Sequence, residues 1–292
     1  MLIRIFNSKN FFLFPMQTKL SFIALLLCVV FLNSCNSRAK EEKNADEKLK
    51  NIEQLIVGNQ FDAALLQIDT INILYPRLVA KRKIAAALKD TIIRRQSADV
   101  LKYSNSVLPR KLAQLDSLQK EFRFEKDDTY QEFGNFVYKS QITEQNTSRN
   151  YLKCYVDENA DLYVISNVVG TKLNQKSLKV SSGALSVQTD TLNATTGNFH
   201  SFSNDGTYWE TLTFKNEADS GIVAFVAKHK AERIKVDLTG TKKLSYYLSD
   251  QDKKAIAATY DFWILKKDVK KLQNDVEKAT IRIGRIQLRY KN

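Results

Sequence analysis

The stretch SDQDKKAIAATYDFWILKKDVKKLQNDVEKATIRIGRIQLRY, residues 249–290, decides most of the fold of this chain. Its opening, Ser249 to Asp252, has the form of an N-terminal capping box, in which side chains satisfy the first free N–H groups of a helix. Apolar residues then recur in alternating steps of three and four: Phe262, Leu265, Val269, Leu272, Val276, Ala279, Ile283, Ile286 and Tyr290. This heptad spacing predicts a coiled-coil helix over residues 249–292.

An apolar seam of this length must be buried against a partner. Residues 77–126 have a helical, strongly charged composition and carry a second stripe on the same spacing: Leu101, Leu108, Leu112, Leu115 and Phe122. We expect the two segments to pair antiparallel as a helical stalk, while pairing between two copies of the chain stays open as a route to an oligomer. Pro109 is expected to kink or break the first helix. Trp263, beside the seam, is expected to fix the helix to the neighbouring domain.

Between these helical regions, over residues 130–248, the apolar pattern changes to period two. Short runs rich in Val, Tyr, Phe and Thr alternate with turns, which predicts an antiparallel β-sandwich-like domain inserted between the stalk helices. The fold class is therefore α+β. The expected strands are 133–141, 151–156, 161–169, 177–181, 184–189, 208–215, 221–227, 233–239 and 242–248.

Upstream, residues 48–76 have helical spacing interrupted by a turn at Gly58-Asn59-Gln60 and end at Pro76, which predicts a helical hairpin. Its second half resembles the second helix of a tetratricopeptide repeat. The pattern does not recur 34 residues later, so a solenoid of stacked repeats is not expected. Residues 35–47 are polar and charged and are expected to form a flexible tether.

The first 34 residues have the organisation of a signal peptide. An apolar run from Leu20 to Leu32 is too short for a membrane-spanning helix and follows a basic residue, Lys19. Leu32-Asn33-Ser34-Cys35 resembles the lipobox of bacterial lipoprotein precursors, which implies cleavage before Cys35 and lipidation of its sulfur. Because Asn36 and not Asp follows, this resemblance implies sorting to the outer membrane. An uncleaved short anchor is the alternative, and either Met1 or Met16 is the start.

The middle and C-terminal parts also resemble uncharacterised lipoproteins of the Bacteroidota type. The shared phrases are Ile68-Asp69-Thr70-Ile71 with Tyr75-Pro76-Arg77, Asp161-Leu162-Tyr163-Val164-Ile165-Ser166, and Leu248-Ser249-Asp250-Gln251-Asp252-Lys253. This resemblance covers most of the exported chain and implies no activity.

Charge and cysteine content limit the possible partners. The chain carries 45 Lys and Arg against 32 Asp and Glu, a net charge of +13, which attracts anionic lipid, acidic glycan or nucleic acid. Export argues against nucleic acid. Because Cys28 lies in the leader and Cys35 is expected to be lipidated, only Cys154 remains, so no intramolecular disulfide and no cysteine-based zinc site is expected. We expect Cys154 to be buried in a strand.

No pattern of catalytic, cofactor-binding or metal-ligating residues stands out. Asp157 to Asp161 begins like a calcium loop but lacks the required Gly and Glu, so it predicts a hairpin turn. The only histidines, His200 and His229, stand alone in the sequence. Two aromatic pairs, Tyr208-Trp209 and Tyr246-Tyr247, could instead form a platform on which a sugar stacks.

These observations predict a non-enzymatic cell-envelope lipoprotein, an interaction or structural component displayed on the outer membrane. The alternative is a surface glycan-binding lipoprotein that uses its β domain. An enzyme built from carboxylates on distant strands is a third possibility. Exposure of Trp209 beside a second ring in a groove would favour the glycan-binding alternative.

Overall fold

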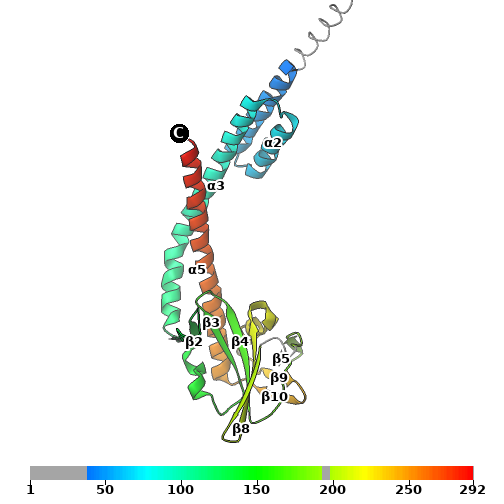
Figure 1. Cartoon of the computed structure of the whole chain (residues 1–292), viewed down its shortest axis with the longest axis vertical. Helices are drawn as coiled ribbons and strands as arrows, with labels where there is room; N and C mark the ends of the chain where they lie inside the picture. The colour runs from blue at the N-terminus through cyan, green and yellow to red at the C-terminus, as the bar shows by residue number, and fades with distance from the viewer. Residues whose placement is uncertain (1–37, 193–197, 292) are drawn as a thin grey trace, which may run out of the picture. The chain divides into compact units, whose positions relative to one another are not determined.

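The computed structural model describes residues 38–192 and 198–291, which combine long helices with two antiparallel sheets (Figure 1). The α+β class is therefore confirmed. The chain divides into two compact units. One contains the residues up to Ala98 and those from Ile281 onward, and the other is Asp99–Thr280. The boundaries lie inside the two long helices, α3 (Val79–Gln119) and α5 (Asp250–Arg289), and not at their junctions with the sheets.

The first unit is built from the helix of residues 38–57, α2 (Phe61–Leu74) and the adjoining parts of α3 and α5. Asn59 adopts a left-handed conformation, with φ of 56°, in the expected turn between the first two helices. Residues 38–47, expected to be a flexible tether, are helical. The reason is that Ala45 continues the apolar stripe of Leu49, Ile52 and Ile56, and all four side chains are buried in the core of this unit.

A kink or a break was expected at Pro109, and no break occurs, because helix α3 continues through this residue. Proline removes one helical hydrogen bond and crowds the preceding turn. Leu108, Leu112 and Leu115, on either side of it, pack into the hydrophobic cluster of the second unit. We attribute the persistence of the helix to this packing, which offsets the local cost of the proline.

The second unit contains two antiparallel sheets. The larger has the order β1-β2-β3-β4-β8-β7 and the smaller the order β10-β9-β5-β6. The strands are β1 (Phe122–Glu125), β2 (Asn135–Tyr138), β3 (Tyr151–Asp157), β4 (Leu162–Val169), β5 (Ser177–Ser182), β6 (Leu185–Gln188), β7 (Phe199–Asn204), β8 (Thr207–Lys215), β9 (Lys235–Thr239) and β10 (Lys243–Tyr247).

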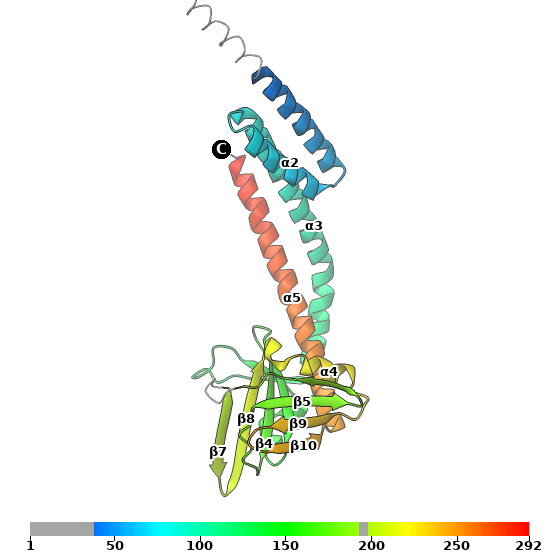
Figure 2. The same cartoon turned by 90° about the vertical axis from the view of Figure 1, so that its right-hand side faces the viewer.

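One face of the larger sheet is covered by both the smaller sheet and α5. Val164 and Leu212 from the larger sheet share a hydrophobic cluster with Leu178 and Val236 from the smaller one. Figure 2 shows β5, β9 and β10 running across β4 and β8. Nearer β1, the ring of Phe262 on α5 stacks on Phe122, with centroids 4.5 Å apart. We call this covered face the inner face.

Two differences from the expected strands stand out. Residues 221–227, predicted as a strand, belong to helix α4 (Ile222–Lys228). Both carboxylate oxygens of Asp219 accept backbone N–H groups, from Gly221 at 3.0 Å and Val223 at 2.9 Å, so a cap overrides the strand-like composition. Strands β1 and β7 were not predicted, because β1 lies in an expected helix and β7 is exposed along almost its whole length.

Helix α5 buries much of the predicted seam. Phe262, Val269, Leu272, Ala279 and Ile286 are buried, whereas Tyr290 is largely exposed. Within the second unit, the Lys111 ammonium on α3 lies 2.7 Å from the Asp268 carboxylate on α5. The indole N–H of Trp263 donates to the carbonyl of Ala160 at 3.0 Å, in the turn between β3 and β4. Trp263 therefore contacts the sheet from α5.

Candidate functional site

The outer face of the larger sheet, opposite the smaller sheet, contains a pocket of about 260 Å³. Side chains of a strand alternate between its two faces. On β4 the buried Val168 points inward, so its neighbours Asn167 and Val169 point outward. Thr211 and Trp209 on β8 are their cross-strand partners and therefore also point outward. The segment 143–147 and strand β7 complete the pocket, whose lining residues are Thr143, Asn146, Thr147, Tyr151, Asn167, Val168, Val169, Phe202, Asn204, Trp209, Glu210 and Thr211.

Two aromatic rings form one wall of this pocket. Phe202 on β7 is the cross-strand partner of Trp209 on β8. Their rings stack with centroids 5.1 Å apart and planes 11° from parallel. Phe202 is 59% exposed, and the Trp209 indole N–H donates to the Thr147 carbonyl at 2.9 Å. Trp209 is therefore held at the rim by both neighbours and does not lie in the core.

The remaining lining is polar but offers no free charge. Asn167, Asn204 and Thr211 supply amide and hydroxyl groups, which can both donate and accept hydrogen bonds. Among the described residues, Glu210 is the only charged one in the lining, and it is 1% exposed. Its carboxylate accepts the backbone N–H groups of Leu173 and Asn174, each at 2.7 Å, and of Gln175 at 3.3 Å. The negative charge of Glu210 is thus compensated by these three backbone N–H groups.

The opposite wall is held in place by a buried polar network. The Asn146 amide donates to the carbonyls of Ser140 and Ile142, and Arg149 donates to its oxygen at 2.8 Å. Arg149 also binds Asp252, at the start of α5, through two hydrogen bonds of 2.6 and 2.7 Å. Such a paired guanidinium–carboxylate contact fixes both distance and orientation. The wall at 143–147 is therefore preformed and does not need a ligand to order it.

The structure separates the four aromatic residues expected to form a sugar platform. Trp209 lies at the pocket, whereas Tyr208 points to the opposite face of β8 by strand alternation. Tyr246 and Tyr247 lie on β10, at the edge of the smaller sheet. The Tyr246 hydroxyl is buried without a hydrogen-bond partner, and Tyr247 lies under the Arg233 guanidinium at 3.7 Å. The ring that does accompany Trp209, Phe202, was missed because β7 lacks an apolar alternation.

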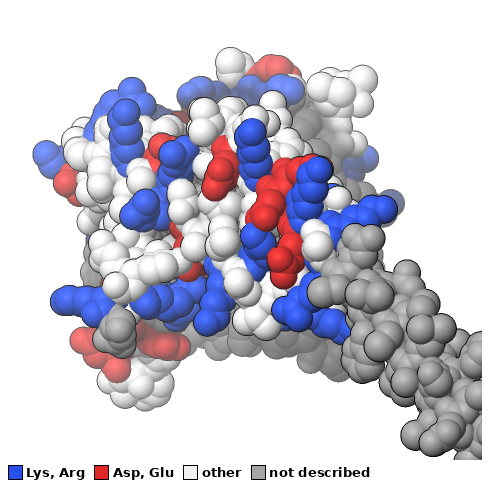
Figure 3. Space-filling model, turned by 90° about the horizontal axis from the view of Figure 1, so that it is seen from above, with Lys and Arg blue, Asp and Glu red and all other residues white. Residues whose placement is uncertain are grey.

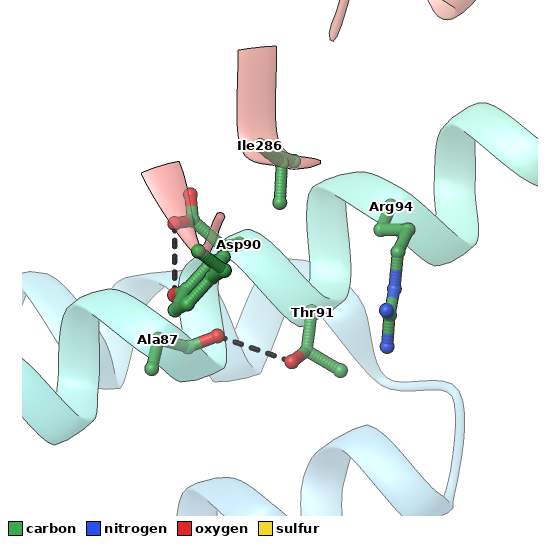
Figure 4. A pocket seen from close by; sticks show the side chains of 6 residues that line it. Ala87, Asp90, Thr91, Arg94 and Ile286 are labelled. Carbon is green, nitrogen blue, oxygen red and sulfur yellow. Dashed lines mark hydrogen bonds between the residues drawn. The ribbon is translucent and has the colours of Figure 1, made fainter. Parts of the chain in front are cut away.

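Other pockets also lie within single units. In the second unit, Tyr260, Trp263 and the turn 216–221 line a space of about 370 Å³. In the first unit, a pocket of about 250 Å³ lies beside Asp90 (Figure 4). The Asp90 carboxylate, which is buried, is 3.1 Å from the Arg289 guanidinium and accepts the Tyr290 hydroxyl at 3.1 Å. Through these two contacts, Asp90 on α3 holds the end of α5.

The other candidate residues named from the sequence are not brought together into a site. Asp157 to Asp161 form the expected turn between β3 and β4, with Ala160 at φ of 64°. His229 pairs with Glu232 at 2.9 Å, and His200 lies on the exposed β7. Cys154 is free and buried on β3, as expected, and burial raises the pKa of its thiol. Cys35 and the predicted leader fall outside the described residues.

Metal-ligand clusters and membrane-spanning helices are both absent from the described part of the chain. No cluster of three or more His, Cys, Asp or Glu side chains suited to a metal ion occurs among residues 38–192 and 198–291. Within the same ranges, every helix is too short or too polar to cross a membrane. Figure 3 shows one face of the chain, on which Lys and Arg are spread among uncharged side chains with Asp and Glu between them.

No protein family, curated protein or solved structure matches this chain. The site must therefore be interpreted from its own geometry.

Proposed function

We propose that this protein is a lipid-anchored component of the cell envelope that binds an uncharged carbohydrate, without catalysis, in the pocket on the outer face of the larger sheet. The observation that carries the proposal is the Phe202–Trp209 stack at the rim of a preformed pocket lined by amides and hydroxyls. Of the alternatives that the sequence left open, this geometry favours glycan binding.

The physical basis is the match between this lining and a pyranose ring. A sugar presents an apolar face of C–H groups, which packs on an aromatic ring, and a rim of hydroxyls, which exchange hydrogen bonds with amides and hydroxyls. A ligand site is expected to combine an apolar wall with a few placed polar groups. Among the described residues that line the pocket there is no Lys or Arg, so no cation is available there to pair with an acidic sugar. This favours a neutral glycan over the acidic glycan that the net charge suggested.

The anchoring part of the proposal rests on the sequence. Leu32 to Cys35 has the lipobox form, and acylation with two or three chains gives durable attachment to a membrane. We propose that the mature protein begins at lipidated Cys35 and is held at the outer membrane. The intact mass of the membrane-extracted protein tests this, since a chain that begins before Cys35 or carries an unmodified Cys35 would contradict it.

We further propose that α3 and α5 pair along the heptad seam as a coiled-coil stalk and that the two sheets act as a β-sandwich-like head. Supporting this are the buried seam residues of α5, the Lys111–Asp268 ion pair and the hydrophobic cluster that both sheets share. Because this pairing would bury the apolar seam within one chain, less apolar surface would remain for contact with a second copy.

Calorimetric titration with neutral oligosaccharides, including glucans, mannans and galactans, tests the binding proposal. We expect one class to bind, and we expect Trp209→Ala and Phe202→Ala each to weaken its binding at least tenfold. Tyr247→Ala is the matched control, because it removes a half-exposed ring from the other sheet. Circular dichroism and melting temperature must show that each variant is folded.

Two results would overturn the proposal. If every neutral glycan fails to bind, or if binding persists unchanged in both Trp209→Ala and Phe202→Ala, the pocket is not a carbohydrate site. The leading function would then be the one favoured by the sequence, engagement of another envelope component.

A further inference from the structure

Helix α2 in the first unit is apolar on two opposite faces. Ala64, Ile68 and Ile71 are buried in the core of this unit. On the other face, Leu66 is 70% exposed and Ile73 is 76% exposed. Leu74 and Val79, at the end of α2 and the start of α3, are 56% and 58% exposed. Ile73, Leu74 and Val79 lie within seven residues of one another, around the turn from α2 to α3, and exposed large apolar side chains grouped in this way mark a contact with a partner or a membrane.

The start of α3 is basic. Residues 77–83 contain four Lys and Arg and no acid, and of these Lys81 is paired with Asp46. Arg77 and Lys83 are exposed beside Val79 in the sequence, at the start of α3. Arg82 is also exposed and donates to the Pro76 carbonyl at 3.1 Å. Apolar side chains bordered by cations are the combination that lies at the interface of a membrane with anionic lipids.

Contacts within the unit place this surface beside the first half of helix 38–57. Helix 38–57 and α2 are joined by a short turn, so the end of α2 returns toward the beginning of the first helix. Tyr75 lines a pocket together with Asn44, Glu47 and Lys48, and the Lys81 ammonium pairs with Asp46. Residue 44 lies about 9 Å along the helix from residue 38, at 1.5 Å per residue. Cys35 precedes the described helix by only three residues in the sequence.

We infer that Ile73, Leu74 and Val79, together with Arg77 and Lys83, form a membrane-docking surface for the headgroup region of a bilayer that contains anionic phospholipid. The apolar side chains would enter the boundary between headgroups and acyl chains, while the two cations contact lipid phosphates. The lipid on Cys35, which belongs to the proposed function, would hold this surface close to the bilayer. The surface would thereby add a second, non-covalent attachment to the first unit.

The test is co-sedimentation of the non-lipidated chain from residue 36 onward, which retains every described residue, with vesicles. We expect binding to vesicles of 70% phosphatidylcholine and 30% phosphatidylglycerol, weak binding to pure phosphatidylcholine, and loss of most binding in 0.5 M salt, because exposed charges are then screened at about 4 Å. The variant Ile73→Ser/Leu74→Ser/Val79→Ser and the variant Arg77→Glu/Lys83→Glu should each bind at least tenfold more weakly.

Matched controls separate this surface from general charge and apolarity. Val57→Ser changes a residue that is equally exposed but lies at the other end of helix 38–57. Arg285→Glu/Lys291→Glu makes the same change in net charge on the last part of the chain. Both controls should bind vesicles as the unchanged chain does.

Three outcomes would overturn the inference. They are absence of vesicle binding, equal weakening by the control variants, and competition by free phosphate at millimolar concentration, which would indicate a simple anion site. Sedimentation velocity without lipid provides a fourth. A dimer that Ile73→Ser/Leu74→Ser/Val79→Ser dissociates would assign the surface to a second copy of the chain. None of these results affects the carbohydrate proposal, which concerns the other unit.

Discussion

At the scale of single residues, Glu210 links the two sheets. It extends from β8 on the inner face and receives three backbone N–H groups from residues 173–175, which lead into β5. A buried carboxylate is costly unless it is fully hydrogen-bonded, and here it is. The same residue forms part of the pocket lining. The Glu210 side chain thus fixes the connection between the two sheets from the face opposite the candidate site.

We predict that Glu210→Ala lowers the free energy of unfolding by about 3 kcal/mol, because three buried N–H groups lose their acceptor. Glu210→Gln keeps one acceptor oxygen and should cost roughly half as much. Urea denaturation of the two variants checks the order, with Glu217→Gln as an exposed control. Equal stability of Glu210→Ala and the unchanged protein would show that this link contributes nothing.

At the scale of elements, Trp263 joins α5 to the larger sheet. Besides its hydrogen bond to the Ala160 carbonyl, it packs against the hydrophobic cluster, and the Lys267 ammonium lies 4.4 Å from its ring centroid. Lys270, about two turns beyond Trp263, donates to the Asn159 carbonyl at 2.8 Å. Helix α5 is therefore attached to the turn between β3 and β4 at two successive points.

Truncation of Trp263 tests this attachment. Trp263→Ala should destabilise the second unit by about 2 kcal/mol, less than a fully buried aromatic residue would, because the ring is only half-buried. Trp263→Phe should cost less, since it retains an aromatic ring and loses only the hydrogen bond and part of the packed area. Thermal denaturation gives both values, with Tyr130→Ala as the exposed aromatic control. If the Trp263→Ala midpoint equals that of the unchanged chain, this contact does not support the docking of α5.

At the scale of the whole molecule, buried tyrosines couple the fold to alkaline pH. Burial raises the pKa of Tyr151 to about 12, and burial also raises the pKa of Tyr155 and of Tyr246. A folded-state pKa above the unfolded value of about 10 stabilises the fold below that pH. This stability is lost as the pH rises from 10 through the folded-state values, because the unfolded chain then releases protons that the folded chain retains.

We therefore predict cooperative unfolding above pH 10. Absorbance at 295 nm should show that some of the 12 tyrosines ionise only when circular dichroism reports unfolding. Tyr151→Phe should move the unfolding midpoint to higher pH, whereas Tyr130→Phe, at an exposed position, should not. Complete ionisation of all tyrosines in the folded protein would contradict the prediction.

Periodicity in the sequence was sufficient to predict the long C-terminal helix, most of the strands and the α+β class, because local propensity and apolar spacing agree along those segments. It could not predict the helical start at residues 38–47, the continuity of α3 through Pro109, or α4 in place of a strand. In each case burial or a cap overrides the local preference. Neither β7 nor Phe202 carried a recognisable signal, because an exposed edge strand has no apolar alternation.

The candidate site, too, could be predicted from the sequence only in part. Trp209 was identifiable as a candidate from the sequence, but its partner ring and the paired charge of Glu210 depend on strand register and on a loop 35 to 37 residues away. Register is set by the packing of whole sheets, not by neighbours in the chain. The sequence by itself determined most of the segments that form helices and strands, and where a lipid is expected. Only the tertiary structure decided which side chains share a pocket, because that depends on contacts between residues far apart in the chain.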